Sequence, residues 1–329
     1  MPFEILGIGS ALVDVMIRVN DEFLTKEGLP KGGMTLVEAD RSKDLLDQFP
    51  DSAKQFCPGG AAANVIASFA CCGGNAAFAG KIGKDKTGDY FKTQTEKALV
   101  HYLELYSPDR QTGIVVSFIT PDGERTFATH LGAAVEMTPD DLTPAVMNQA
   151  PLLLVEAYLV FNPDLFTHIL KTARTNGQKM ALDLSSFTVV EQNKDRFKKA
   201  LENKYVDILF ANEDESRAFT GLPPQESLNV FTSYCETAVV KEGGKGSFIS
   251  KNGRTVRIPA EKVNVADTNG AGDAYAGGIL FGLSKNLDIQ TAGALGSKAG
   301  ALIVSQSGAR LTPENAAILN DYAKKILNS

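Results

Sequence analysis

Short apolar segments alternate with longer amphipathic segments along most of this chain, which leaves few folds open to it. The apolar segments have the length and the bounding turn residues of buried β-strands, and the segments between them, such as residues 195–203, have helical periodicity. This alternation is typical of a mostly parallel sheet covered by helices, so we predict an α/β fold. The predicted strands are residues 4–8, 76–80, 152–156, 180–183, 208–211 and 238–241.

Two regions depart from this pattern because their residues alternate with the period of two that is typical of half-buried strands. The first region contributes residues 12–19 and 33–38, and the second contributes residues 113–120 and 125–130, with a hairpin-type turn at Pro121-Asp122-Gly123. We interpret them as a small sheet that projects as a lid. The prediction is one domain, residues 1–329, with a discontinuous β lid from about 12–40 and 112–132.

Charge and cysteine content exclude several classes of protein. The net charge is −6 and there is no block of consecutive basic residues, so neither nucleic acid nor an anionic membrane is an expected partner. The four cysteines form no Cys-x-x-Cys pair, which favours free thiols over a zinc site. The N-terminal segment carries Glu4 and Asp14 instead of a basic start, and no stretch approaches ~18 uninterrupted apolar residues. We therefore expect a cytoplasmic protein.

A glycine-rich turn that opens into an apolar helical pattern is the strongest sign of chemistry. Gly270, Ala271 and Gly272 carry little side chain, so their N–H groups and the helix dipole can hold an anion such as a transferring phosphoryl group. Asp273, beside that anion, can accept a proton from an attacking hydroxyl. The alternative is that Asp273 only complements the helix dipole.

A second cluster of small residues, from Cys57 to Asn64, also leads into a helical pattern. Gly59 and Gly60 allow a ligand to approach closely, and the amide of Asn64 can bind a diol. Asp14 follows the first strand and can accept hydrogen bonds from two vicinal hydroxyls. Tight packing of the helix on a strand explains the alanines equally well, and Asp14 could instead be a solvated lid residue.

Neither common nucleotide-binding motif is complete in this sequence. Leu12 stands where Gly-x-Gly-x-x-Gly requires its third glycine, and the glycines from Gly243 to Gly246 lack the P-loop spacing. The glycine clusters near residues 60 and 270 instead resemble the two signatures of the ribokinase family, the PfkB-type sugar and nucleoside kinases. The resemblance covers nearly the whole chain and implies a ribokinase-like doubly wound fold and ATP-dependent phosphorylation of an alcohol group.

The resemblance also implies roles for individual residues. Asp273 would be the catalytic base, and the amides of Gly270, Ala271 and Gly272 would form the anion hole. Asn212 and Glu215 match the Asn-x-x-Glu motif that positions Mg²⁺ and ATP phosphates through water, although alone this acidic segment would be interpreted as a solvated helix start. The residues implied in ATP binding are Asn212, Lys241, Gly243 and Gly246, with Lys241 in place of the usual threonine.

Within that family, the N-terminal segment is most similar to the adenosine kinases and their bacterial relatives. Ser10 replaces an asparagine of the animal enzymes but keeps a hydroxyl, and Tyr158 and Phe187 follow predicted strands, where they could stack on a purine. Ordinary core packing is the alternative for each aromatic residue. The implied substrate-binding residues are Ser10, Asp14, Gly59, Gly60, Asn64, Phe127, Thr129, Tyr158 and Phe187.

Two further charges follow from the resemblance. Arg125 is similar to a lid arginine that reaches the transferred phosphate, with a surface hairpin charge as the alternative. A K⁺ ion beside the anion hole would add positive field near the phosphates. The residues implied in K⁺ binding are Asp267, Asn269, Val304, Ser307 and Gly308.

Together these features predict an ATP- and Mg²⁺-dependent kinase that phosphorylates a primary hydroxyl, first of all the 5′-hydroxyl of adenosine. Closure of the lid over the substrate would exclude water and protect ATP from hydrolysis. Two alternatives stay open: a sugar kinase acting on ribose, fructose or a keto-deoxy sugar acid, and a nucleoside-binding regulator without catalysis. The intact Asp273 motif argues against the regulator, and the chain is compatible with a monomer or a homodimer.

Overall fold

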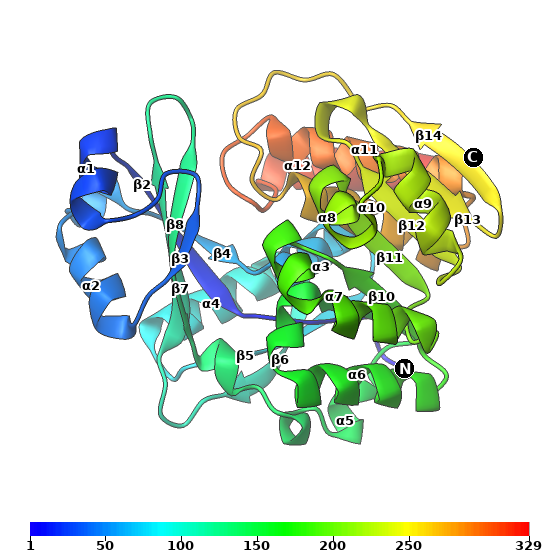
Figure 1. The fold of residues 1–329 in the computed structure, drawn as a ribbon, viewed down its shortest axis with the longest axis horizontal. Coiled ribbons are helices and arrows are strands. Elements are labelled where there is room, and N and C mark those ends of the chain that lie inside the picture. The colour runs from blue at the N-terminus through cyan, green and yellow to red at the C-terminus, as the bar shows by residue number, and fades with distance from the viewer. Residues whose placement is uncertain (329) are drawn as a thin grey trace.

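A large sheet and a smaller one organise residues 1–328, the part of the chain that this computed structural model describes (Figure 1). The large sheet has nine described strands in the order β14-β13-β12-β11-β10-β9-β1-β5-β6, all parallel from β12 to β6, with β13 and β14 antiparallel. Its strands are β1 (Ile5–Ile8), β5 (Ala76–Ile82), β6 (Val100–Tyr106), β9 (Leu152–Glu156), β10 (Lys179–Asp183), β11 (Ile208–Asn212), β12 (Thr237–Lys241), β13 (Ser247–Lys251) and β14 (Arg254–Ile258).

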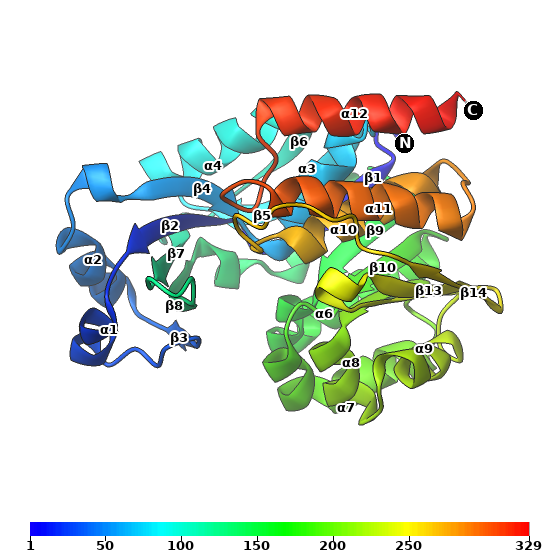
Figure 2. The same ribbon diagram turned by 90° about the horizontal axis from the view of Figure 1, so that it is seen from above.

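Helices cover both faces of this sheet, which confirms the predicted doubly wound α/β fold (Figure 2). One apolar layer lies under α3, α4, α10, α11 and α12, and the other lies under α6, α7, α8 and α9. The helices are α1 (Asp21–Glu27), α2 (Ala39–Asp47), α3 (Ala61–Cys71), α4 (Lys86–Lys97), α5 (Pro144–Met147), α6 (Pro163–Thr175), α7 (Phe187–Glu202), α8 (Glu213–Thr220), α9 (Pro224–Thr232), α10 (Ala271–Ser284), α11 (Ile289–Val304) and α12 (Pro313–Leu327). Among the described residues, no helix is both long and apolar enough to cross a membrane.

The strand order reverses next to β1. The chain adds β5 and β6 on one side of β1, then returns to add β9, β10, β11 and β12 on the other side. Ligands of such sheets bind outside the carboxyl ends of the strands where the order reverses. This topology therefore directs attention to the carboxyl ends of β1 and β9.

The small sheet forms a separate layer beside the large one (Figure 1), in the order β3-β8-β7-β2-β4. Alternate residues face opposite sides of a strand. Val15 and Ile17 of β2 and Ala128 of β8 pack toward α1 and α2, so Asp14 of β2 and Arg125 of β8 face the other way, toward the large sheet. The strands are β2 (Leu12–Arg18), β3 (Met34–Leu36), β4 (Gln55–Gly59), β7 (Thr112–Ile119) and β8 (Arg125–Gly132).

The six strands predicted for the large sheet and the four predicted for the small sheet are present. Four described strands, β4, β6, β13 and β14, were not predicted. Three of them, β4, β6 and β14, lie at sheet edges, where polar residues interrupt the apolar pattern, and β13 is the antiparallel strand between β12 and β14. The helix predicted at residues 195–203 is the second part of α7. Asn193, with φ −130°, interrupts the helical geometry before it, and the helix ends one residue earlier than predicted, at Glu202.

Candidate active site

A group of charged side chains lies where the strands of the large sheet end. Glu156 and Asp183 are the last residues of β9 and β10, and Lys241 is the last residue of β12. The parallel register brings these ends to one edge of the sheet, and α10 and α3 begin beside them. The sequence analysis did not single out Glu156 or Asp183, although a carboxylate at the end of a predicted buried strand was the signal that could have identified them.

Asp273 lies in the first turn of α10, as the glycine-rich turn predicted. Gly270 starts that helix with φ +75°, and a Cβ there would lie 2.7 Å from the carbonyl oxygen of Ala309, so the position requires glycine. Burial and, to a smaller extent, the charge of the neighbouring Asp183 raise the pKa of Asp273 to about 7, against the opposing effect of Asn64, whose Nδ2 donates to Asp273 Oδ2 at 3.1 Å. A carboxylate that titrates near neutrality suits a general base.

Lys241 supplies positive charge next to the glycine-rich turn that starts α10. Its Nζ donates to Asp183 Oδ2 at 3.0 Å, and a Cβ on Gly272 would lie 3.4 Å from the same Nζ. Burial alone would lower the pKa of Lys241, but the carboxylates of Asp183, Glu215 and Asp273 outweigh burial and raise it. The side chain therefore adjoins the turn around Gly272, a position compatible with the role in ATP binding that the resemblance implies.

Glu156 ties together two segments that border the site. Its Oε1 accepts from the Ser10 N–H at 2.8 Å, and its Oε2 accepts from the Ala62 N–H in the first turn of α3 at 2.9 Å. Burial raises the pKa of Glu156 despite these bonds. The loop after β1 and the start of α3 are thus fixed to the end of β9 by one buried carboxylate.

Asp14 lies against Gly59, and Asn64 contacts Asp273. A Cβ on Gly59 would lie 2.4 Å from Asp14 Oδ1, and one on Gly60, where φ is +91°, would lie 2.1 Å from the Ser10 carbonyl oxygen. Burial raises the pKa of Asp14 to about 6, against the opposing charges of Arg310 and Arg125. Asp14 is therefore largely ionised at pH 7 and can accept hydrogen bonds from hydroxyl groups.

The aromatic candidates lie at the same edge of the large sheet or on the small sheet. Tyr158 follows β9 and is 37% exposed, and Phe187 begins α7 shortly after β10 and is 51% exposed. Large aromatic surfaces this exposed are not held in the core, so ordinary core packing does not account for these two residues. Phe127 and Thr129 share with Arg125 the face of β8 that is turned toward the large sheet.

Asn212 and Glu215 form a complete capping box at the start of α8. The Asn212 Oδ1 accepts from the Glu215 N–H at 2.8 Å, and the Glu215 Oε2 accepts from the Asn212 N–H at 2.8 Å. Because both Glu215 oxygens are occupied by Asn212, this pair fits Mg²⁺ only through intervening water. Within residues 1–328 no cluster of three or more His, Cys, Asp or Glu residues could hold a metal ion. Gly243 and Gly246 lie in the turn after β12.

Arg125 connects the small sheet to the turn before α10. Its Nη2 lies 2.5 Å from Asp267 Oδ2, and the same oxygen accepts from the Gly308 N–H at 2.9 Å. Asp267 Oδ1 accepts from the Asn269 N–H at 2.9 Å, and the Val304 carbonyl accepts from the N–H groups of Ala266 and Asp267. These oxygens are occupied by donors and Ser307 is exposed, so the residues present do not fit K⁺ in this arrangement.

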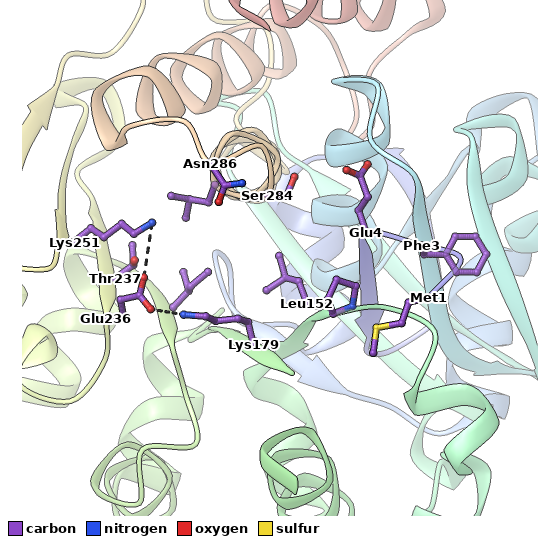
Figure 3. Close-up of a pocket in the computed structure, with 13 residues that line it drawn as sticks. Met1, Phe3, Glu4, Leu152, Lys179, Glu236, Thr237, Lys251, Ser284 and Asn286 are labelled. Atoms are coloured by element: carbon purple, nitrogen blue, oxygen red, sulfur yellow. Dashed lines mark hydrogen bonds and ion pairs between the residues drawn. The ribbon is translucent and has the colours of Figure 1, made fainter. Parts of the chain in front are cut away.

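A separate cavity of about 660 Å³ lies at the opposite, amino-terminal edge of the large sheet (Figure 3). Lys179 and Lys251 both pair there with Glu236, and Glu4 pairs with Lys285. Every charged residue that lines this cavity thus has a partner of opposite charge. It contains none of the residues predicted for the active site.

Comparisons with known proteins identify the family and its fold. A model of the family described as pfkB family carbohydrate kinase matches residues 43–316. The chain is 29% identical to the adenosine kinase of Saccharomyces cerevisiae, covering 94% of this chain and 96% of the relative. The solved adenosine kinase of Sinorhizobium meliloti is 31% identical with a TM-score of 0.89, covering 99% of both chains. A probable sugar kinase from Rhizobium etli is 30% identical with a TM-score of 0.89, covering 98% of both chains.

The family match spans most of the chain, and it includes α3 and the turn into α10 that carry the two glycine clusters. The sequence resemblance to this family is therefore confirmed, together with the ribokinase-like fold. The chain belongs to the pfkB family of carbohydrate kinases and is a phosphotransferase that acts on an alcohol group.

Proposed function

We propose that this chain transfers the terminal phosphoryl group of ATP to the 5′-hydroxyl of a purine nucleoside, with adenosine as its preferred acceptor. The observation that carries the proposal is the hydrogen bond between Asn64 and Asp273. It joins the residues proposed to bind the diol to the proposed catalytic base and anion hole. A nucleoside whose ribose diol lies at Asp14 and Asn64 has its primary hydroxyl on the far side of the ribose, toward Asp273. The similarity to two adenosine kinases supports a nucleoside acceptor.

In this proposal Asp273 accepts the proton of the 5′-hydroxyl while the hydroxyl oxygen attacks the phosphorus atom. The N–H groups at Gly270, Ala271 and Gly272 hold the transferring group, and Lys241 adds positive charge beside them. Mg²⁺, when bound with ATP, neutralises phosphate charge, and Asn212 and Glu215 would hold it through water. Arg125 approaches the turn from the small sheet, where it would face the same phosphates.

The aromatic side chains would form the part of the acceptor site that binds the purine ring. Tyr158 and Phe187 offer exposed rings at the ends of adjacent strands, and a purine stacked on them would cover apolar surface that is now in water. A free sugar would gain nothing from these surfaces. We further propose a cytoplasmic enzyme, either a monomer or a homodimer, whose small sheet acts as a lid and which has no nucleic acid partner.

The experiment that tests this function is an ATP-consumption screen over nucleosides and free sugars. We expect kcat/KM for adenosine at least about tenfold above that for ribose or fructose. Phe187→Ala should narrow this preference by about 1 to 2 kcal/mol, the value of an aromatic stacking contact. Turnover of a free sugar without turnover of any nucleoside would refute the adenosine proposal.

The second candidate function is phosphorylation of a free sugar or a sugar acid. It is favoured by the 30% identity to the Rhizobium etli protein described as a probable sugar kinase. The same screen decides between the two acceptors. Asp273 and the anion hole would serve either one, and only a nucleoside carries a purine ring that can contact the aromatic residues.

A further inference from the structure

Arg310 lies in the loop between α11 and α12, and this loop touches three parts of the active site. The Gly308 N–H donates to Asp267, Ala309 packs against Gly270, and the side chain of Arg310 reaches Asn64. No sequence motif singled out Arg310. Its partner Asn64 is 246 residues away in the chain, so only the folded structure brings the two together.

The guanidinium of Arg310 is held from several sides. Its Nε donates to Asn64 Oδ1 at 3.3 Å, its Nη1 donates to Thr95 Oγ1 at 3.1 Å, and the group lies 5.5 Å from the centre of the Phe91 ring. Nη2 is buried and has no hydrogen-bond partner among the described residues. These contacts fix the plane and the position of the guanidinium relative to α3 and α4.

The contact with Arg310 determines which way the amide of Asn64 points. A guanidinium can only donate hydrogen bonds, so the atom of Asn64 that faces Arg310 must be the carbonyl oxygen. The amide nitrogen then faces Asp273, to which it donates at 3.1 Å. If the amide turned over, its carbonyl oxygen would face Asp273 and would favour the protonated carboxyl group, because a carboxylate cannot donate.

We propose that Arg310 is a positioning residue for phosphotransfer, which holds the Asn64 amide so that its Nδ2 donates to Asp273. This inference rests on the proposed role of Asp273 as the base. It adds a residue outside the glycine clusters whose contribution is to keep the base ionised and oriented toward the acceptor hydroxyl.

The surroundings of Asp273 show why this one hydrogen bond matters. Three carboxylates disfavour the ionised form of Asp273: Asp183 on β10, Glu156 on β9 and Glu215 on α8. Lys241 on β12 favours the ionised form, but its ammonium group is already bonded to Asp183. Asn64 on α3 is the side-chain hydrogen-bond donor to Asp273 among the described residues. Losing the correct amide orientation therefore removes the main local support for the reactive form of the base.

The test compares Arg310→Met, Arg310→Lys, Asn64→Ala and the double variant Arg310→Met/Asn64→Ala. Arg196→Met is the matched control, because Arg196 Nη1 also donates to an asparagine, Asn193 Oδ1, at 2.7 Å but lies on α7 away from Asp273. The readout is kcat against pH with the best acceptor, since Arg310 also acts electrostatically on Asp14 and would change KM by that route. Thermal unfolding checks that each variant is folded.

We expect Arg310→Met to lower kcat at pH 7 about fivefold and to move the midpoint of the pH profile up by about one pH unit, so that activity recovers toward pH 9. Arg310→Lys should restore part of the loss, Arg196→Met should match the wild type, and Arg310→Met should have little further effect once Asn64 is alanine. An unchanged midpoint, or a full additional loss in the Asn64→Ala background, would overturn the proposal.

A measurement without turnover separates this inference from the proposed function. Carboxyl ¹³C NMR of the protein labelled in aspartate, with Asp273→Asn to assign the signal, follows the titration of Asp273 directly. Arg310→Met should raise its midpoint and Arg196→Met should leave it unchanged; equal midpoints in wild type and Arg310→Met would refute the positioning role. If no acceptor is phosphorylated, the proposed function fails, while this titration still decides the role of Arg310. If Arg310→Met does not unfold cooperatively, Arg310→Lys carries the same comparison.

Discussion

At the carboxyl-terminal edge of the large sheet, the carboxyl groups of Asp183, Glu215 and Asp273 lie around the ammonium group of Lys241. At the amino-terminal edge, Lys179, Glu236 and Lys251 are paired and remain partly in water (Figure 3). Both edges hold charged side chains at strand ends, but only the first leaves carboxylates in excess over cations. That excess, combined with burial, shifts the pKa values of Asp273 and Glu215 upward, a pattern that is typical of functional sites.

Among the substitutions that test this difference between the two edges, Asp273→Asn should have the largest effect on kcat. The variant should fold and bind acceptor nearly as the wild type does, and its kcat should fall about 10²-fold to 10⁴-fold, because asparagine cannot accept the hydroxyl proton. Steady-state kinetics with the best acceptor measures the loss. A variant that keeps half of the wild-type kcat would remove Asp273 from the mechanism.

A smaller effect is expected at Asp14, which faces the carboxyl-terminal edge from the small sheet. Asp14→Ala should raise KM for the acceptor about tenfold to a hundredfold, because charge-assisted hydrogen bonds of ~1.5 to 3 kcal/mol to the diol are lost. The KM for ATP should stay nearly constant and serves as the internal control. An unaltered acceptor KM would place Asp14 outside the site.

Burying an excess of carboxylates should also make the free energy of unfolding depend on pH. The pKa of Asp273 is raised from its usual value of 3.8 to about 7, so the folded protein loses stability as the pH rises between these values. Asp273→Asn lacks this loss and should therefore melt at a higher temperature than the wild type at pH 8, by a margin that shrinks as the pH falls toward 4. Thermal unfolding of both proteins across this range measures the margin, and a margin independent of pH would contradict the prediction.

The smallest effect is expected at the opposite edge. Glu236→Gln removes the partner shared by Lys179 and Lys251, yet these side chains are partly exposed, so stability should change by no more than about 0.5 kcal/mol and kcat should stay the same. Denaturant unfolding together with kinetics gives both values. A large change in kcat would mean that the two edges are coupled.

Much of the fold follows from local patterns in the sequence. The six predicted strands of the large sheet are short apolar segments because both faces of a parallel sheet are covered by helices. The edge strand β6 (VHYLELY) mixes polar and apolar residues, so its pattern does not separate it from an amphipathic helix. The sequence identified the turn into α10 as well, because glycines and an acidic residue before an apolar helix are a local signal.

Tertiary structure alone decided which side chains meet. Asn64 and Asp273 are 209 residues apart, and Arg310 and Asn64 are separated by 246, so neither pair has a local pattern from which it could be inferred. Asp183 and Glu156 were visible as strand-end carboxylates, but their burial beside Asp273 depends on the parallel register of β9 and β10. A local sequence determines secondary structure through periodicity and turn chemistry, whereas the pKa of a base depends on every charge and hydrogen bond that the folded chain brings within reach.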